Sequence, residues 1–423
     1  MCLSMCYSAT QASKHSRMDR SRLNIGAYHL QPYAHSEQHV KDVADCGIDF
    51  MLCIRGDRTL LDLFRKYNVG AIVSDIVPGW WGSDGDNAGT LKYKNPLSAY
   101  DAAAEKFQDH PAIWGIDIGD EPSALDFPHY GKIYEKVSML FPHQFPYLNL
   151  YPNYASVAEN NAAQTVNQLG TKTYEEHIAS YCKNVPANYI CYDFYLYSIN
   201  VHQAYENLRV VSNACKETGR SMWIVLQVNS NKKEQWITEN ELRFQAYTAM
   251  AFGAENIIWA CYTAGWWHNQ VLDDNGEKTQ QYDKLRTVNS EIHHLGKNYM
   301  KYRRVATDFV GFKSTEWLKD VKQQPVESFT NGLFSALRAT DNAPLVVGSM
   351  VSRKHGGKEA LFICAADDPY DRKPIHHTIT FKTDGRKLKA TGGRGELTLQ
   401  RNENGYYTID IMSNEGVLIE ASK

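Results

Sequence analysis

Three carboxylates close one apolar run of the chain, in the stretch WGIDIGDEPS. Asp117, Asp120 and Glu121 fall within five residues, and Pro122 then ends the run. Two carboxyl groups on either side of a bond can share acid–base work, because one donates a proton while the other activates a nucleophile or a water molecule. Partial desolvation beside an apolar strand raises the pKa of a carboxyl group. We therefore expect Glu121 to hold a proton and to act as a general acid.

The partner of Glu121 has more than one candidate. Asp193 in CYDFYLYS is the first choice, because apolar neighbours surround it and a buried acid is costly without a role or a hydrogen-bond partner. Asp75 and Asp120 are the alternatives, and we expect at least one of them to bind substrate hydroxyls. Each acid also has a structural interpretation. Glu121 could be a helix-start acid favoured by the helix dipole, and Asp193 could hold a neighbouring tyrosine or amide in place.

The elements that must position these acids follow from an alternation of apolar runs with amphipathic stretches. The apolar runs span residues 23–30, 48–55, 69–77, 112–121, 145–151, 189–197, 221–228 and 256–264. Continuous apolar runs that alternate with helical patterns predict parallel strands covered by helices. Eight such units match a (β/α)8 TIM barrel. An open doubly wound sheet is the rival, but it normally has a glycine-rich phosphate turn after its first strand, and GAYHLQPYAHS is not one.

The pattern changes after residue 304. Apolar and polar residues then alternate, and turn signals such as TNG, HGG, DGR and ENG interrupt them, which predicts an antiparallel β-sandwich. We therefore divide the chain into three parts. Residues 1–22 are a disordered or processed N-terminal segment, 23–304 form the (β/α)8 barrel, and 305–423 form a small C-terminal β-sandwich domain.

The strand ends of a barrel meet at one rim, where such folds keep their chemistry. Here the predicted ends carry carboxylates, amides and aromatic rings, which suit a polyhydroxylated ligand such as a carbohydrate. Polar groups would bind its hydroxyls, and rings would stack on its apolar faces. The residues that we predict to bind such a substrate are His29, Asp75, Trp80, Trp81, Asp120, Asn149, Tyr151, Tyr195, Gln227, Tyr262, Trp266, Trp267 and His268.

Composition narrows the classes of partner. Aromatic residues make up 12% of the chain, with 26 Tyr and 9 Trp, which favours a ligand that stacks on rings. The net charge of −3 argues against nucleic acid or an anionic membrane as the main partner. No apolar run reaches the ~18 residues of a membrane span. Neither the histidines nor the cysteines have metal-site spacing, so we predict no metal and no cofactor.

Two further expectations concern the cysteines and the N-terminus. Cys53, Cys191 and Cys261 fall within apolar runs and are expected to be small buried side chains without disulfides. The segment LSMC is faintly similar to a bacterial lipoprotein cleavage site, although no apolar stretch precedes it. We therefore expect a periplasmic, cell-surface or secreted protein.

Several of these segments together resemble a known family. GDEP with Glu121, the later YDFY, FPYLNLYPNY and RFQAYTAMAFGAENIIW are similar to clan-A (β/α)8 glycoside hydrolases, and most of all to the family 42 β-galactosidase-like proteins common in Bacteroidetes. The resemblance implies hydrolysis of a glycosidic bond, with Glu121 as proton donor. The chain departs from the family at two points. Asp120 stands where the clan usually has Asn, and strand seven, WIVLQVNS, has Gln227 where the clan has a nucleophilic Glu.

The departures leave several alternatives open. Glu121 and Asp193 could work in an inverting arrangement, or the protein could bind glycans without cleaving them. GIDIGDE is also similar to the chitinase-type motif of substrate-assisted N-acetylhexosaminidases, although Gly119 replaces its middle Asp. A barrel aldolase or isomerase would need a Schiff-base lysine or metal ligands at the strand ends, and the eight runs supply neither.

Overall fold

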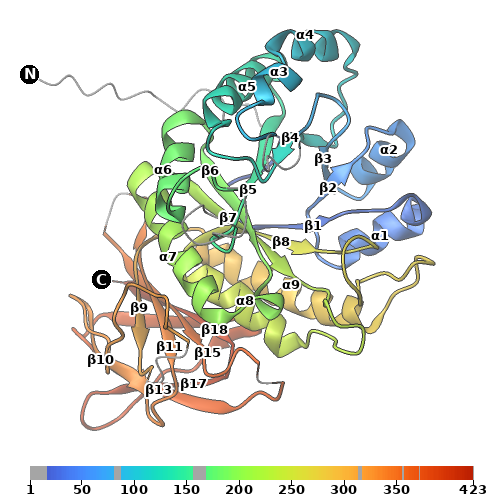
Figure 1. Cartoon of the computed structure of the whole chain (residues 1–423). Helices are drawn as coiled ribbons and strands as arrows, with labels where there is room; N and C mark the ends of the chain where they lie inside the picture. The colour runs from blue at the N-terminus through green and yellow to red at the C-terminus, as the bar shows by residue number, and fades with distance from the viewer. Residues whose placement is uncertain are drawn as a thin grey trace, which may run out of the picture.

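The first part of the chain folds into a closed barrel. The computed structural model describes residues 17–80, 87–155, 168–312, 317–354, 357–370 and 372–422. Eight parallel strands pair in chain order and the last pairs with the first, which confirms the predicted (β/α)8 barrel (Figure 1). The strands are β1 (Asn24–Tyr28), β2 (Phe50–Ile54), β3 (Gly70–Val73), β4 (Ile113–Asp120), β5 (Phe145–Leu150), β6 (Tyr189–Phe194), β7 (Ser221–Gln227) and β8 (Ala254–Ala260).

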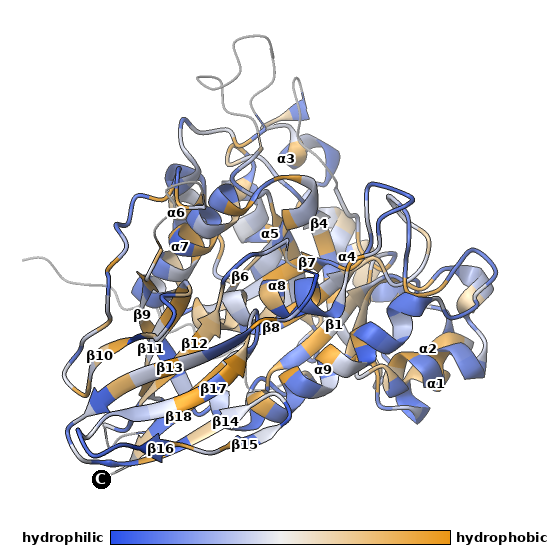
Figure 2. Cartoon of the chain, turned by 90° about the horizontal axis from the view of Figure 1, so that it is seen from below, coloured by the Kyte–Doolittle hydropathy of each residue, from blue (hydrophilic) through white to orange (hydrophobic). Residues whose placement is uncertain are grey.

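Helices surround the barrel, and local signals fix several of their ends. Thr173 and Thr238 each begin a helix with a capping box, in which the threonine and a glutamate three residues later satisfy each other's backbone N–H. The helices are α1 (Glu37–Asp45), α2 (Arg58–Lys66), α3 (Leu91–Lys94), α4 (Leu97–Lys106), α5 (Phe127–Leu140), α6 (Tyr174–Asn184), α7 (Val201–Thr218), α8 (Glu239–Ala251) and α9 (Gln280–Tyr299). Helices such as α1 and α2 carry both hydrophobic and hydrophilic residues, as expected for helices with one buried side (Figure 2).

Side chains fill the barrel at its N-terminal end. Phe145, Tyr189 and Trp223 form an aromatic layer there, with Tyr189 and Trp223 stacked at 4.4 Å between ring centroids. The Arg20 guanidinium lies 5.3 to 6.0 Å from the three ring centroids and closes the layer from below. Side chains therefore fill this end of the barrel, and the strands finish at the opposite end.

The C-terminal part forms two antiparallel sheets, which confirms the predicted β-sandwich. One sheet has the order β10-β13-β17-β16 and the other β15-β14-β18-β12-β11-β9. The strands are β9 (Tyr302–Val310), β10 (Phe334–Ala339), β11 (Leu345–Ser352), β12 (Glu359–Ala365), β13 (His376–Thr383), β14 (Lys387–Gly392), β15 (Gly395–Leu397), β16 (Gln400–Arg401), β17 (Tyr407–Met412) and β18 (Gly416–Ser422). Residue 304, where we placed the end of the barrel, lies within β9.

The six-stranded sheet packs directly against the barrel. Its strands β11, β12 and β18 contact α8, and β14 and β18 contact α9. Phe362 of this sheet belongs to the same buried cluster as the barrel core, and its ring lies 5.4 Å from that of Tyr299 on α9. Gly348 allows the close approach, because a Cβ at this position would lie 3.1 Å from the carbonyl carbon of Ala251. The barrel and the facing side of this sheet therefore share one buried core, and the interior between the two sheets forms a second cluster.

One cysteine differs from the expectation. Cys191 and Cys261 are buried, as expected, but Cys53 on β2 is exposed. The pairing of β2 with β3 shifts register between Met51 and Ile54, which interrupts the regular strand at this residue. The apolar residues around Cys53 in the sequence did not indicate this irregularity. Among the helices of the described residues, none has both the length and the apolar character needed to cross a bilayer.

Candidate active site

Two carboxylates meet at the C-terminal ends of three neighbouring strands. Asp120 ends β4, Asn149 is near the end of β5, and Asp193 is near the end of β6. The Asn149 Nδ2 group donates to Asp120 Oδ1 at 3.1 Å and to Asp193 Oδ1 at 2.9 Å. Because both oxygens contact the same nitrogen, they lie within about 6 Å of each other.

A third acid, Asp117, joins this group through an irregularity in β4. In a regular strand, residues three apart face opposite sides of the sheet. The pairing of β4 with β5 shifts between Asp117 and Gly119, so that Asp117 pairs with Tyr147 and Asp120 pairs with Asn149. Tyr147 and Asn149 are two residues apart and share a face, so the bulge turns Asp117 and Asp120 to the same side of β4. We did not predict Asp117 as a site residue. The glycine after Ile118 was the one signal for the bulge.

Burial and like charge perturb two of these acids. Burial raises the pKa of Asp193 to about 7, and the negative charge of Asp120 adds to the shift. Hydrogen bonds donated by Asn149 and Tyr154 act in the opposite direction, because they stabilise the ionised form. Burial likewise raises the pKa of Asp117 to about 8, again with a contribution from Asp120. Asp117 and Asp193 therefore titrate near neutral pH, which suits proton transfer.

Glu121 follows directly on Asp120 and is half-buried at the rim. Its backbone has a positive φ of 46°, and its N–H donates to the Asn149 carbonyl at 3.0 Å. Tyr154 connects it to the buried acids, since the Tyr154 hydroxyl donates to Asp193 Oδ2 at 3.3 Å. Burial raises the pKa of Tyr154, and the negative charges of Asp193 and then Glu121 raise it further. Glu121 and Asp193 thus act on the same phenol, which we did not single out from the sequence.

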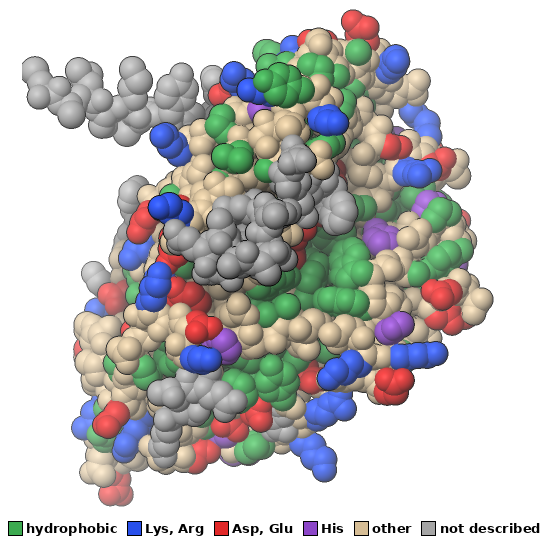
Figure 3. Space-filling view, in the orientation of Figure 1, with side chains coloured by type: hydrophobic (Ala, Val, Ile, Leu, Met, Phe, Trp, Pro, Cys, Tyr) green, Lys and Arg blue, Asp and Glu red, His purple; other side chains and the backbone are tan. Residues whose placement is uncertain are grey.

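Aromatic side chains gather beside the acids. The Trp266 ring lies 5.9 Å from Tyr28, 6.0 Å from Tyr195 and 6.4 Å from His29, and Trp267 lies 5.0 Å from Tyr195. The face seen in Figure 3 is hollowed beside β1 and β8, and hydrophobic side chains gather in the hollow. The Trp266 indole N–H is buried and has no acceptor within the described parts of the chain. This cluster therefore offers flat surfaces and a hydrogen-bond donor.

His29 belongs to the same cluster but is engaged within the protein. Its Nε2 lies 2.7 Å from the Ala264 carbonyl and 3.0 Å from Gln31 Nε2. Burial lowers the pKa of His29, so the neutral imidazole is favoured at neutral pH. These contacts link the end of β1 to the loop after β8, and they hold the wall that carries Trp266.

Gln227, at the end of β7, is fully buried and engaged. Its Nε2 donates to Ser198 Oγ at 3.1 Å and to the Asn229 carbonyl at 3.0 Å, and its Oε1 accepts from Tyr197 N–H at 3.0 Å. Its amide group thus joins the loops after β6 and β7. The contacts of this side chain lie within the protein wall.

Asp75 and His268 are both exposed, and the contacts described here join them to other parts of the chain than the acids. Asp75 Oδ1 accepts from the Gly56 N–H at 2.9 Å and borders a separate cavity of about 370 Å³, which Phe107 also lines. His268 pairs through its backbone with Ser230, with both N–H to carbonyl distances at 2.8 Å.

The remaining predicted residues occupy varied positions. Tyr262 is buried, and burial raises its pKa. Cys46 and Tyr282 add to this shift, so the Tyr262 side chain lies close to the helices outside the barrel. Tyr151 is buried at the end of β5. The Trp80 carbonyl accepts from the Asp120 N–H at 3.0 Å, which fixes the end of β4. Trp81 lies outside the described residues.

The described residues offer no group of three or more histidine, cysteine, aspartate or glutamate side chains that could hold a metal ion. The chemistry that this arrangement can support is proton transfer between carboxyl groups and a bound molecule.

Comparisons with known proteins show similarity of fold only. No protein-family model matches the chain, and no curated protein matches it either. Among solved structures it is similar to the catalytic module of a family 98 glycoside hydrolase from Streptococcus pneumoniae, with 10% identity, a TM-score of 0.43, and coverage of 96% of this chain and 100% of that one. It is also similar to xylanase 10B from Thermotoga maritima, with 11% identity, a TM-score of 0.42, and coverage of 65% and 97%.

A third likeness is to an endoglucanase from Pseudomonas stutzeri, with 15% identity, a TM-score of 0.40, and coverage of 62% of this chain and 92% of that one. At these identities and TM-scores the likenesses decide nothing about activity. The function must be inferred from the residues of this chain.

Proposed function

We propose that the protein is a glycoside hydrolase that cleaves a glycosidic bond in an oligosaccharide or polysaccharide at the mouth of the barrel. The observation that carries the proposal is the Asn149 side chain, which binds the carboxylates of both Asp120 and Asp193 beside a cluster of aromatic rings. Glycoside hydrolysis requires two carboxyl groups, and Glu121 and Asp193, the proposed acid and base, both act on the Tyr154 phenol. We make the proposal at the level of the reaction and leave the sugar and linkage open.

In the proposed mechanism, Glu121 donates a proton to the glycosidic oxygen as the bond to the anomeric carbon breaks. Asp193 in its ionised form accepts a proton from the water molecule that attacks the anomeric carbon. The pKa of Asp193, about 7, suits a general base that works near neutral pH. Asp120 remains close enough for its negative charge to stabilise the positive charge that develops on the sugar ring.

The absence of a carboxylate at the end of β7 is the reason for assigning a water molecule as nucleophile. An amide such as that of Gln227 cannot attack the anomeric carbon, and this one is already hydrogen-bonded to Ser198 and Asn229. A direct displacement by water needs only an acid and a base. The mechanism therefore differs from the retaining mechanism that the family resemblance implies.

The same residue favours a second candidate function, a barrel that binds glycans without cleaving them. If Gln227 marks the loss of a nucleophile, the aromatic cluster of Tyr195, Trp266 and Trp267 would still bind a sugar. Binding and turnover must therefore be measured separately.

The test is a panel of aryl glycosides and polysaccharides, assayed for cleavage and, by calorimetry, for binding. We expect the wild type to cleave at least one substrate and Glu121→Gln to lose about a hundredfold or more in turnover with little change in affinity. Cleavage by Glu121→Gln at the wild-type rate would remove Glu121 from the proposal. Binding without any turnover by the wild type would establish the second function instead.

A further inference from the structure

A second cavity, of about 310 Å³, lies at the end of the barrel opposite to the carboxylates. Asn188, Ser221 and Gly253 line it, and these residues stand at or just before the starts of β6, β7 and β8. The β-domain supplies another part of the wall through Arg303 and Arg304 of β9. The cavity is thus built where the barrel and the β-domain meet, a common location for ligand sites.

The cavity wall is strongly basic. Five arginines and one lysine line it, against Glu255 as the single carboxylate among the described lining residues. Within the described parts of the chain, the one ion pair that these six cations make is between Arg353 and Glu255. Lys216, Arg303 and Arg353 are exposed to solvent. Arg20, Arg220 and Arg304 lie deeper in the wall, where a positive charge is costly unless an anion enters.

Part of this positive charge has a structural use. Helices of a (β/α)8 barrel end on this side, and cations are favoured near helix C-termini. Arg220 donates through Nη2 to the carbonyls of Cys182 and Val185 at the end of α6, at 2.8 and 3.0 Å. Arg304 donates to Thr307 Oγ1 at 2.7 Å and to Asn213 Oδ1 at 3.1 Å. These neutral acceptors hold the guanidinium groups in place, and Asp308 offsets part of the charge of Arg304.

Two guanidinium nitrogens remain unsatisfied. Arg20 Nε and Arg220 Nη1 are buried, and neither has a hydrogen-bond acceptor among the described residues. The Arg20 guanidinium is held by its contacts with the three rings and by a hydrogen bond to Asn188, so it cannot turn freely toward another acceptor. Buried donors in native proteins nearly always find an acceptor, so these two indicate a missing one.

We propose that this cavity is a binding site for a small molecule that carries a phosphate or sulfate group. A tetrahedral oxyanion would supply acceptors to Arg20 and Arg220 and would offset the charge of Arg304. The cavity has more room than one such group fills, so an organic phosphate or sulfate larger than the free ion can enter it, and sugar esters serve as probes. Because both domains line it, the bound anion would also stabilise their junction.

The experiment is isothermal titration of the full chain with sodium phosphate, sodium sulfate, glucose 6-phosphate and glucose 6-sulfate, at constant ionic strength set with sodium chloride. We expect saturable binding of the anions, and tighter binding of the sugar esters than of the free ions. Arg20→Met should weaken the affinity about tenfold, because it removes one charge-assisted hydrogen bond. Binding of the free ions that equals that of the sugar esters would contradict a site for an organic phosphate or sulfate.

Further variants separate binding from folding. Arg303 and Lys216 are exposed on the cavity wall, so Arg303→Gln and Lys216→Gln should fold normally and still weaken binding several-fold. Arg338→Met, on the exposed side of β10, is the matched control and should bind as the wild type does. The proposal fails if chloride produces the same heat as phosphate, or if the Arg303 and Lys216 variants bind with unchanged affinity.

Discussion

Asp120 places its negative charge beside two other acids, Asp117 and Asp193, and the pKa values of both are raised. Asp193 is buried and its pKa rises to about 7, while that of Asp117 rises to about 8. Like charges that share a poorly solvated space cannot all ionise easily, so the group retains protons at neutral pH. Acids with raised pKa values gather at sites of proton transfer, and this group therefore supports the proposed function.

The pH dependence of protein stability measures the free-energy cost of ionising Asp117 in the folded chain. Its pKa is about 8 in the folded chain and ordinary in the unfolded chain, so the folded chain binds the extra proton between about pH 4 and 8. Stability therefore falls as the pH rises through that window. Asp117→Asn keeps an acceptor for the Gly119 N–H but cannot ionise. We expect it to stabilise the protein by about 1–3 kcal/mol at pH 9 and not at pH 3, as measured by urea unfolding. Equal stability of the two proteins at pH 9 would contradict the raised pKa.

For individual residues, the sequence predicted some members of the candidate site and missed others. Asp120, Glu121 and Asp193 could be found because each is an acid at the end of an apolar run. Gln227 sits at an equivalent strand end, yet its amide is turned into the wall by Ser198 and Asn229, and no local pattern predicts which way such a side chain points. Tyr154 was not predicted, because it contacts Asp193 across a long loop and no local pattern indicates such a contact.

Among the elements, β4 decides the geometry of the site. Its register shift occurs between Asp117 and Gly119, and Gly119 packs against Tyr130 and the Trp80 carbonyl. The eight strands themselves could be predicted because strands covered on both faces are continuous apolar runs. A bulge leaves no comparable pattern, so its effect on Asp117 was not predictable.

Gly119→Ala tests this element. A Cβ at Gly119 would overlap the Tyr130 hydroxyl and lie 2.9 Å from the Trp80 carbonyl oxygen, so the strand end must move. We expect a loss of about 1–3 kcal/mol in unfolding free energy, together with reduced turnover. Gly56→Ala is the control, because the nearest atom to its new Cβ is 3.5 Å away, at ordinary contact distance. Wild-type stability of Gly119→Ala would contradict the packing described for β4.

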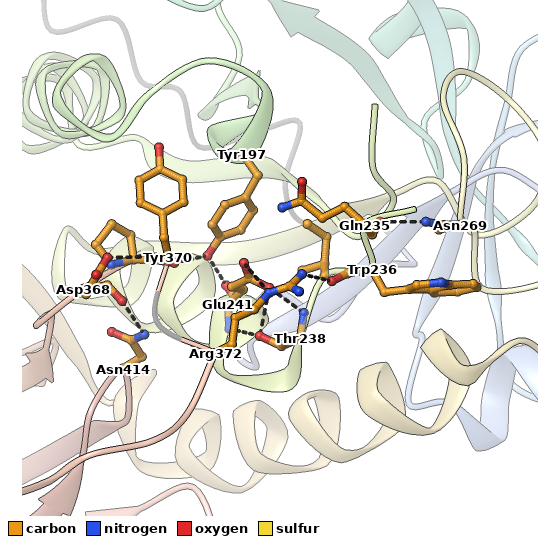
Figure 4. Close-up of polar contacts among 12 residues, drawn as sticks. Tyr197, Gln235, Trp236, Thr238, Glu241, Asn269, Asp368, Tyr370, Arg372 and Asn414 are labelled. Atoms are coloured by element: carbon orange, nitrogen blue, oxygen red, sulfur yellow. Dashed lines mark hydrogen bonds and ion pairs between the residues drawn. The ribbon is translucent and has the colours of Figure 1, made fainter. Parts of the chain in front are cut away.

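In the whole molecule, the β-domain supports the loop that follows β6. The Tyr197 hydroxyl lies 2.9 Å from the Glu241 carbonyl oxygen and 3.0 Å from that of Pro369, and its ring lies 5.9 Å from Tyr370 (Figure 4). Nearby, Arg372 Nη2 donates to the Trp236 carbonyl at 2.8 Å. Because Tyr195 stands two residues before Tyr197, these contacts connect the β-domain to the aromatic cluster of the site.

A shared core implies that the two domains unfold together. Gly348→Ala introduces a Cβ that overlaps the Ala251 carbonyl oxygen at the end of α8. We expect differential scanning calorimetry to record one transition for the wild type and one for the variant, at a temperature lower by several degrees. Gly332→Ala should leave the transition unchanged, because nothing lies within 4 Å of its new Cβ. Two separate transitions in the wild type would contradict a common core.

The proposed chemistry depends most on Asp193, and the pH dependence of turnover by Asp193→Asn tests it most directly. On an aryl glycoside that the wild type cleaves, we predict that wild-type turnover rises as the pH passes through about 7, as the base ionises. Asp193→Asn should lose this rise and about a hundredfold or more in turnover. Asp283→Asn, at an exposed acid on α9, should match the wild type. Turnover by Asp193→Asn that keeps the wild-type rate and pH profile would contradict the assignment.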